Sequence, residues 1–508
     1  MTLQKNLLNL NLFNFIYLFS HLLYRTNSIM ELGGTFPKNL QYKISQLMGH
    51  SKTCVKLTPD RTAVRHGESF RVKLPSNSII DLRTLCLYAK GTCEVSSGDE
   101  VHFPRNSSSL IKTLSVFCNG TLIERIDNYN ILYNRIYDMD GGGIDQNAKR
   151  YLEISDPSVS YSATATFTNA TPVILTSSAT NITTDRKLCV NNFLGFISSA
   201  SCPCPDTNDT GVIEIEIELA NENILWASAH ATAGSAPAPV GAKWRLDDVH
   251  WTINKIVFND PLYYNLKASK MLSSGLQIAY QTYISSKGSV ITKSSVSVNA
   301  TINTTSLDQL ICCYSPESVP ITKLQLFGSN NATNSLSFNN VMTGYYREAN
   351  NDIEFISGQA NANLHDNTTG DAFNQSLFFK SDASGLGTSS IEINNTPLMP
   401  QPLEDYEVFN ETLIALGNNN LDMSSGIYPG CRSLPDFLKY FFVHIVSLEN
   451  ISKNDDFYKS GLDGKSSALN VVWKQHYPTT GGNVVPYIYA KCTRIIQINE
   501  GNQITIIV

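Results

Sequence analysis

Carboxylates are the first side chains of this sequence that could do chemistry. Glu214, Glu216 and Glu218 alternate with isoleucines in the segment 212–219. A period of two predicts a half-buried strand, on which the three carboxylates share one face at a spacing of roughly 6 to 7 Å. Such a row could bind a cation, but a solvated or interface-facing stripe is the simpler interpretation.

The eleven cysteines show no metal-binding pattern. One proline separates Cys202 from Cys204, and Cys312 is followed by Cys313. Neither pair is joined by a second pair or by histidines at zinc spacing. We therefore predict no metal ion and no cofactor. We expect most cysteines to be free thiols that are buried or partly exposed. A few disulfides remain an alternative.

No local signature of an enzyme is present. The sequence lacks the Gly-x-Ser-x-Gly elbow and the His-Glu-x-x-His pair, and no lysine follows the glycines of 141–143 as it would in a phosphate-binding loop. His444 lies in an apolar run, which favours a hydrogen-bonded histidine of the core or of an interface. The acidic pairs 247–248 and 455–456 could serve a glycosidase, but chance supplies such pairs in a chain of this length. The prediction is a protein without catalytic residues.

Length and composition limit what the chain can be. Its 508 residues predict two domains, and an apolar share of 42% is enough for sizeable cores. Charged residues make up only 16%, with 38 Lys and Arg against 44 Asp and Glu and a net charge of −6. This balance argues against electrostatic binding of nucleic acid. A surface with so few charged residues must be covered by neutral polar groups. Such a surface is typical of proteins that form large protein contacts or of extracellular proteins.

The hydrophobic pattern predicts an all-β protein with a few short helices. Strands are expected at 70–74, 82–93, 110–118, 122–126, 212–219, 249–258, 276–284, 290–301, 309–314, 321–327, 437–448, 468–475, 487–498 and 503–508. Asn119 and Gly120 form the predicted structural turn of a hairpin, because a type I′ turn needs positive φ at both central residues. Asp127 is expected to cap the helix that follows, and further helices are expected after Asp260 and over 403–416.

Small residues, Pro and Gly fill the segment 231–243, which is the best candidate for a linker. The predicted division is an N-terminal arm or upstream extension over 1–45, a first domain over 46–240 and a second over 241–508. Segments 155–205 and 328–400 are rich in small and polar residues. They are expected to be long loops that carry irregular strands at one end of each domain and that make partner contacts.

The N-terminal segment leaves two classes of protein open. Residues 7–23 are apolar but contain asparagines, which makes a membrane-spanning helix expensive, and no small-residue cleavage site follows them. An arm, or an upstream extension before Met30, is favoured over a secretory signal. Sequons such as those at Asn299 and Asn367 keep a secreted glycoprotein open as the alternative.

Three stretches of the first half resemble a known family. They are 74–85 (Leu-Pro-Ser-Asn-Ser-Ile-Ile-Asp-Leu-Arg-Thr-Leu), 103–120 (beginning Phe-Pro-Arg-Asn-Ser and ending Phe-Cys-Asn-Gly) and 126–139 (Ile-Asp-Asn-Tyr-Asn-Ile-Leu-Tyr-Asn-Arg-Ile-Tyr-Asp-Met). Their order and spacing are similar to those of the major capsid proteins of polinton-like viruses, adintoviruses and virophages. The resemblance implies two consecutive eight-stranded jelly rolls, a double jelly roll.

The same resemblance implies a function in assembly. Three chains would form a homotrimer, a pseudo-hexameric capsomer of an icosahedral shell, which contacts neighbouring capsomers, penton proteins and minor capsid proteins. The protein would be found in the virion capsid after assembly inside the host cell, without sequence-specific nucleic-acid binding. The N-terminal arm would lie on the capsid interior, against neighbouring capsomers, a minor protein or an internal membrane. The alternative is a secreted or cell-surface β-sandwich glycoprotein of the lectin or adhesin kind.

Overall fold

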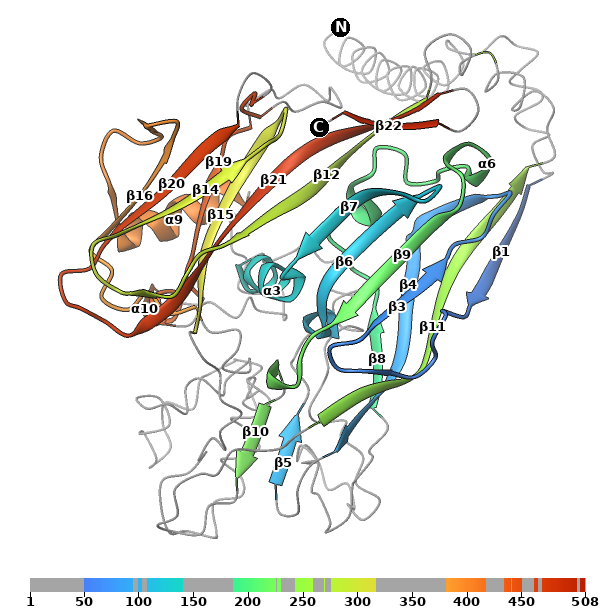
Figure 1. Ribbon diagram of the computed structural model, residues 1–508, viewed down its shortest axis with the longest axis horizontal. Coiled ribbons are helices and arrows are strands. Elements are labelled where there is room, and N and C mark those ends of the chain that lie inside the picture. The colour runs from blue at the N-terminus through green and yellow to red at the C-terminus, as the bar shows by residue number, and fades with distance from the viewer. Residues whose placement is uncertain are drawn as a thin grey trace, which may run out of the picture. The chain divides into compact units, whose positions relative to one another are not determined.

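The computed structural model describes residues 50–94, 99–102, 107–139, 186–224, 226–229, 243–258, 269, 276–316, 381–416, 434–439, 441–449, 461–464, 468–499 and 503–507. Among these, the residues of 53–255 and 270–508 belong to one compact unit, and residues 50–52, 256–258 and 269 belong to a second. Antiparallel strands dominate the described residues (Figure 1). The predicted all-β class is confirmed.

The first eight main strands form two four-stranded sheets. They are β1 (His50–Leu57), β3 (Ser69–Lys73), β4 (Ile79–Glu94), β6 (Ile111–Cys118), β7 (Thr121–Asp127), β8 (Arg186–Val190), β9 (Ile213–Leu219) and β11 (Lys243–Phe258). One sheet has the order β1-β11-β4-β8 and the other β3-β9-β6-β7. Strand β2 (Val64–Arg65) pairs with β11, while β5 (Asp99–His102) and β10 (Trp226–Ala229) pair with each other.

The next eight main strands repeat this arrangement. They are β12 (Leu276–Lys287), β14 (Val296–Ile302), β15 (Leu307–Pro316), β16 (Thr388–Ile393), β17 (Thr396–Pro397), β19 (Val443–Ser447), β20 (Leu469–His476) and β21 (Asn483–Asn499). Their sheets have the orders β12-β21-β15-β19 and β14-β20-β16-β17. Short strands β13 (Ile291–Thr292), β18 (Leu403–Glu404) and β22 (Gln503–Ile507) extend them.

The two sets of strands have the same connectivity. Counted along the chain, one sheet of each set holds the first, eighth, third and sixth strands, and the other holds the second, seventh, fourth and fifth. Eight strands interleaved between two sheets in this way make a jelly roll. The chain therefore contains two consecutive jelly rolls, as the resemblance implied.

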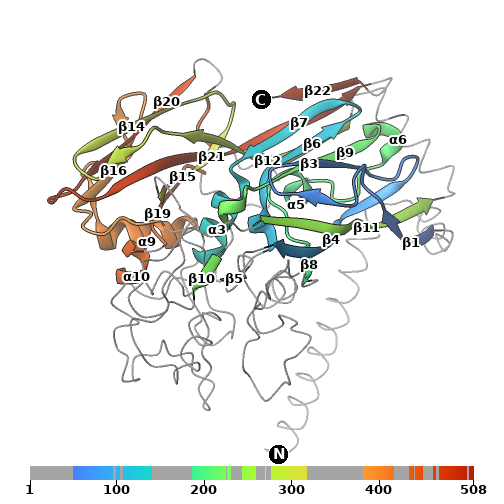
Figure 2. The same ribbon diagram turned by 60° about the horizontal axis from the view of Figure 1, so that its bottom comes forward.

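Few helices accompany the strands in the described residues. The α-helices are α3 (Tyr129–Met139), α5 (Phe196–Ser199), α6 (Thr207–Thr210), α9 (Asp405–Ala415) and α10 (Leu434–Lys439), and the 3₁₀ turns are η1 (Ser107–Leu110) and η3 (Glu222–Ile224). Helix α9 packs on β19, where the hydroxyl of Thr412 donates to the carbonyl of Val443 at 2.8 Å (Figure 2). No helix of the described residues is long and apolar enough to cross a membrane.

Alternating burial holds the sheets together. In β9, Ile213, Ile215, Ile217 and Leu219 are at most 1% exposed, while the glutamates between them are only partly buried. Complete burial of one such aliphatic side chain contributes roughly 1.5 to 3 kcal/mol. The period of two seen in the sequence therefore fixes which face of the strand is turned inward.

Strand β11 corrects the predicted domain boundary. It lies between β1 and β4 and is the eighth strand of the first jelly roll, whereas the division between residues 240 and 241 had assigned it to the second domain. The first and last strands of a jelly roll are neighbours, so the chain must return after the small-residue segment 231–243 to close the first sandwich. The second roll begins at β12. The predicted arm over 1–45 lies outside the described residues.

Some of the other predicted segments agree with the structure, some differ from it, and some lie outside the described residues. Strands β8 and β16 lie within the segments 155–205 and 328–400, the long loops that were expected to carry irregular strands. The predicted strand of 437–448 starts as helix α10 and becomes β19 only at Val443. The helix after Asp260, the strand of 321–327 and the glycines of 141–143 lie outside the described residues.

The connection from β6 through β7 to α3 differs in one detail from expectation. Asn119 and Gly120 join β6 to β7 with φ angles of 48° and 79°. Asp127 was expected to cap α3, but its carboxylate instead accepts from Arg125 Nε at 3.0 Å and from the Thr113 hydroxyl at 3.4 Å. Asn128, with a positive φ of 52°, stands between Asp127 and the helix. The carboxylate is therefore used within the sheet.

Candidate functional site

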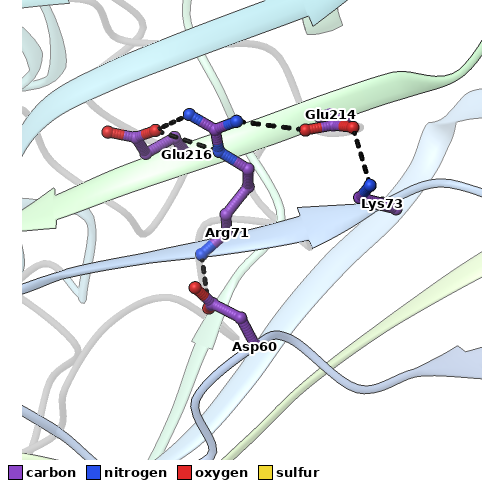
Figure 3. A network of polar contacts seen from close by, with 5 residues as sticks. All are labelled: Asp60, Arg71, Lys73, Glu214 and Glu216. Atoms are coloured by element: carbon purple, nitrogen blue, oxygen red, sulfur yellow. Dashed lines mark hydrogen bonds and ion pairs between the residues drawn. The ribbon is translucent and has the colours of Figure 1, made fainter.

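The glutamates of β9 are engaged in ion pairs with the two neighbouring strands, β3 and β6. Figure 3 shows the pairs that Glu214 and Glu216 form with Arg71 and Lys73 of β3. Arg71 of β3 donates from Nε to Glu216 at 3.0 Å and from Nη1 to Glu214 at 3.2 Å. Lys73 Nζ lies 3.2 Å from the second oxygen of Glu214, and Lys112 of β6 lies 2.6 Å from Glu218. All three carboxylates thus have basic partners.

This pairing removes the cation-site interpretation of the stripe. The hydrogen bonds that Arg71 donates to Glu216 and Glu214, opposed by desolvation, raise the pKa of Arg71. The guanidinium also lies 4.6 Å from the ring centre of Phe117. Within the described residues no three carboxylate, thiol or imidazole groups gather as metal ligands would. On the outer face of β3, β9 and β6 the three glutamates are thus balanced by Arg71, Lys73 and Lys112.

His444 is a core residue, as the sequence indicated. It is fully buried on β19, and its Nδ1 lies 2.8 Å from the hydroxyl oxygen of Ser389. The same oxygen accepts from Trp473 Nε1 at 2.9 Å. Burial lowers the pKa of His444 to about 4, so the imidazole is neutral near pH 7.

The cysteines of the described core are free thiols. Cys118, Cys312, Cys313 and Cys492 are buried, and burial raises the pKa of the Cys118 and Cys313 thiols to about 12. A thiol that stays protonated is neither a nucleophile nor a metal ligand. Cys202 and Cys204 are partly exposed free thiols, which confirms the expectation for these six positions. Cys54 is also a free thiol, but it is exposed.

The two jelly rolls are joined by hydrogen bonds between β7, β12, β21 and the segment that leads into α3. The hydroxyl of Tyr280, on β12, donates to the carbonyl of Ile123, on β7, at 2.7 Å. Tyr489 of β21 donates to the carbonyl of Asn128 at 3.1 Å, and the Asn128 amide donates to Ser285 at 3.3 Å. Strands β7 and β12 run side by side here (Figure 1).

Two serines add a ladder to the same junction. Ser201 N donates to the carbonyl of Ala279 at 2.7 Å, and Ala279 N donates back to the Ser201 hydroxyl at 2.9 Å. The Ser199 hydroxyl accepts from Gln281 N at 2.8 Å and lies 3.1 Å from its carbonyl. Strand β12 is the edge of its sheet, so these residues of the first roll satisfy backbone groups that the edge would otherwise leave open.

A buried carboxylate lies beside this ladder. Glu124 of β7 is 1% exposed and accepts a hydrogen bond from Phe196 N, at the start of α5, at 2.8 Å. Burial raises the pKa of Glu124 to about 7, while the Phe196 N–H, Thr282 and the charge of Arg494 oppose the rise. The two rolls together therefore enclose a group that titrates near neutrality.

Sequence reasoning missed Glu124 because a β-bulge hides it. Val116 is paired with Glu124 while Phe117 is paired with Leu122, so Ile123 is an extra residue in β7. The extra residue turns both Ile123 and Glu124 inward. The run Leu-Ile-Glu-Arg-Ile departs from strict alternation, and that departure was the only available signal.

Solved virus capsids contain chains of the same fold. A chain of the PBCV-1 virus capsid matches with a TM-score of 0.51 and 10% sequence identity, over 90% of this chain and 96% of that chain. A chain of the Sputnik virophage structure matches with a TM-score of 0.50 and 12% identity, over 90% of this chain and 88% of that chain. No protein-family model and no curated protein sequence matches. At these identities the likeness establishes the fold, a double jelly roll.

Proposed function

We propose that this chain is a major capsid protein of the group formed by polinton-like viruses, adintoviruses and virophages. The observation that carries the proposal is the identical strand order of two consecutive jelly rolls, joined by the serine ladder and the tyrosine contacts. Chains of the PBCV-1 capsid and of the Sputnik virophage share this fold. The ion pairs on the outer face of β3, β9 and β6 balance its charges, which suits packing against a neighbouring protein surface.

The proposed mechanism is assembly by repeated contacts. Two equivalent rolls in each of three chains give six similar units around a threefold axis. A heterologous contact that closes after three steps forms a ring and cannot grow into a filament. A permanent trimer of this kind is expected to bury more than about 2,000 Å² at each contact, whereas contacts between capsomers can be weaker because many act together.

The finer parts of the proposal concern partners and location. We infer that the homotrimer contacts neighbouring capsomers, penton proteins and minor capsid proteins, and that it is found in the virion after assembly in the host cell. The protein acts as a structural component and not as an enzyme. Its net charge of −6 favours indirect contact with the genome over direct binding.

The mass of the purified protein in solution tests the proposal. A stable species of three chain masses, which forms hexagonal arrays or closed shells in the electron microscope, is the expected result. A monomer that carries glycans at Asn299 or Asn367 would instead support the secreted glycoprotein. The glycan assay requires expression in a secreting eukaryotic cell, and the assembly assay requires cytoplasmic expression, so both outcomes are accessible.

A further inference from the structure

Strand β14 is an edge strand of the second jelly roll, and β3 is its counterpart in the first. Each is the second main strand of its roll and stands first in the order of its sheet, β14-β20-β16-β17 or β3-β9-β6-β7. An edge strand presents a row of backbone N–H and C=O groups that no neighbouring strand pairs. The two rolls differ in what these groups contact.

In the first roll the outer edge of β3 is closed. Arg71, its central residue, donates its backbone N–H to the Asp60 carboxylate at 2.7 Å and accepts at its carbonyl from Asp60 N at 2.9 Å (Figure 3). The strand also carries two cations, Arg71 and Lys73. A covering loop and charged side chains are two of the means by which an edge strand avoids pairing with another chain.

The pairing of β20 shows which backbone groups of β14 point outward. Asn470 of β20 donates its N–H to the side chain of Asn394, which follows β16, and accepts from Asn394 N, both at 2.9 Å. The backbone groups of Asn470 thus point toward β16, and those of the next residue, Val471, point toward β14, where Ala300 is opposite. The residues of β14 whose N–H and C=O groups point away from β20 are therefore Ser297, Asn299 and Thr301.

These outward groups are open. Within the described residues, no hydrogen bond joins the backbone of Ser297, Asn299 or Thr301 to a segment outside β20. Their side chains are exposed, and the strand contains no charged residue, no proline and no register shift against β20. Strand β14 thus has neither of the protections of β3. We call its residues 296–302 the β14 edge.

The lack of charge extends beyond the strand. Residues 294–307 contain no Asp, Glu, Lys or Arg. Copies of a chain with a net charge of −6 repel one another, and the repulsion is weakest where the surface is neutral. The β14 edge is therefore suited to a contact with a second copy of the chain.

The β14 edge is also complementary to itself in antiparallel pairing. When two copies pair about Asn299, this residue is opposite its own copy and Ser297 is opposite Thr301. All outward N–H and C=O groups of both strands then lie in hydrogen-bonded pairs. The side chains of the inward face are matched in the same register, in the pairs Val296–Ile302 and Val298–Ala300.

We propose that β14 of one copy pairs with β14 of a second copy across a twofold axis centred on Asn299, so that one sheet continues through the contact. A contact of this symmetry joins two copies and ends there. It cannot close the threefold ring of a capsomer, so it joins one capsomer to the next. The inference rests on the proposed capsid function and specifies a surface by which neighbouring capsomers meet.

Charges at position 299 test the pairing, because this residue faces its own copy. Asn299→Lys and Asn299→Asp should each form trimers, but each should need roughly 5-fold more protein than the wild type before the trimers associate, since like charges lie directly opposite. An equal mixture of the two variants, purified separately, should regain wild-type association. Sedimentation velocity over a range of concentrations measures the species, with protein made in bacteria so that Asn299 carries no glycan.

Substitutions at the other edge of the same sheet are the matched controls. Thr396→Lys and Thr396→Asp place charges at an exposed position of β17 and should associate like the wild type, alone and mixed. Asn299→Pro is a second test, because it removes an outward N–H without removing a hydrogen bond to β20. It should abolish association while its circular dichroism melt stays close to that of the wild type.

The outcomes separate this inference from the proposed function. Folded charge variants that associate like the wild type, or a mixture that does not recover association, would overturn the β14 contact and leave the capsid proposal standing. Wild-type trimers that never associate would also overturn the contact. A wild type that forms neither trimers nor arrays would overturn the capsid proposal itself.

Discussion

The carboxylate of Glu124 and the backbone N–H of Phe196 are joined by a hydrogen bond of 2.8 Å, with Gly195 pressed against the same carboxylate. A Cβ atom on Gly195 would stand 2.2 Å from Glu124 Oε1, and the φ of Gly195 is +82°. The groups that face Glu124 from the second roll are Thr282 and Arg494. A titratable group and the contact between the jelly rolls are therefore coupled.

Glu124→Gln should change how stability depends on pH. Because burial raises the pKa of Glu124 from its ordinary 4.5 to about 7, the folded chain binds more protons than the unfolded chain between these values. The free energy of unfolding of the wild type should thus fall by about 3 kcal/mol as pH rises from 4.5 past 7, a loss that the glutamine variant lacks. Urea unfolding at pH 5 and pH 8, at one protein concentration, measures this. Parallel pH profiles for the two proteins would contradict the prediction.

Gly195→Ala should be strongly destabilising. The substitution forces a Cβ into contact with Glu124 Oε1 and places a side chain at positive φ, and it should cost roughly 3 kcal/mol or more. Gly120→Ala is the matched control, because its φ is +79° but nothing lies within 4 Å of an added Cβ. The control should lose only about 1 to 2 kcal/mol. If both variants lost the same free energy of unfolding, measured by thermal or urea unfolding, the close contact between residue 195 and Glu124 would not be the cause of the destabilisation.

Ser389→Ala should weaken the core of the second roll. The hydroxyl of Ser389 serves both His444 and Trp473, so its removal leaves two buried nitrogens without that partner, at about 1 to 3 kcal/mol. Ser390→Ala, at the next and less buried position of β16, should be nearly neutral. Urea unfolding at pH 7 compares the two variants, and similar midpoints would contradict the prediction.

Protonation of His444 should act on stability at acidic pH. Its pKa is lowered from 6.5 to about 4 by burial, so the unfolded chain binds the extra proton between these values. Stability that is present above pH 6.5 is therefore lost as pH falls towards 4, in the opposite direction to the effect of Glu124. A His444→Gln chain should lose less stability over this interval than the wild type. If the wild type and the variant lost the same free energy of unfolding as pH falls from 6.5 towards 4, the result would contradict a neutral buried imidazole at His444.

The sequence predicted well those elements whose structure is decided by residues close together in the chain. The alternation of β9 and the Asn119-Gly120 turn are decided by neighbouring residues, and these elements were predicted closely. Strand β11 could not be assigned from local pattern, because its partners β1 and β4 are at least 149 residues away in the chain. Membership of a sheet is a long-range property that no window of sequence contains.

The contacts between the two jelly rolls could not be predicted from the sequence for the same reason. Tyr280 and Ile123 meet across two domains, and neither position carries a distinguishing motif. The ion pairs of β9 were missed because Arg71 and Glu216 are 145 residues apart. A stripe of glutamates was visible in the sequence, but its basic partners on β3 and β6 became visible only through strand pairing.

Arg71→Met should have a small and salt-sensitive effect on the isolated chain. Its side chain is 41% exposed, and ion pairs at such positions contribute at most about 1 kcal/mol. A double-mutant cycle with Glu216→Gln, measured by urea unfolding at 50 mM and 500 mM salt, should give a coupling energy of about 0.5 kcal/mol that shrinks at the higher salt concentration. Lys73→Met, which removes the more exposed cation, is the control and should change stability less. A coupling of several kcal/mol that ignores salt would instead mean that Arg71 and Glu216 are shielded from water in the solution state, as burial of this sheet face against another copy would produce.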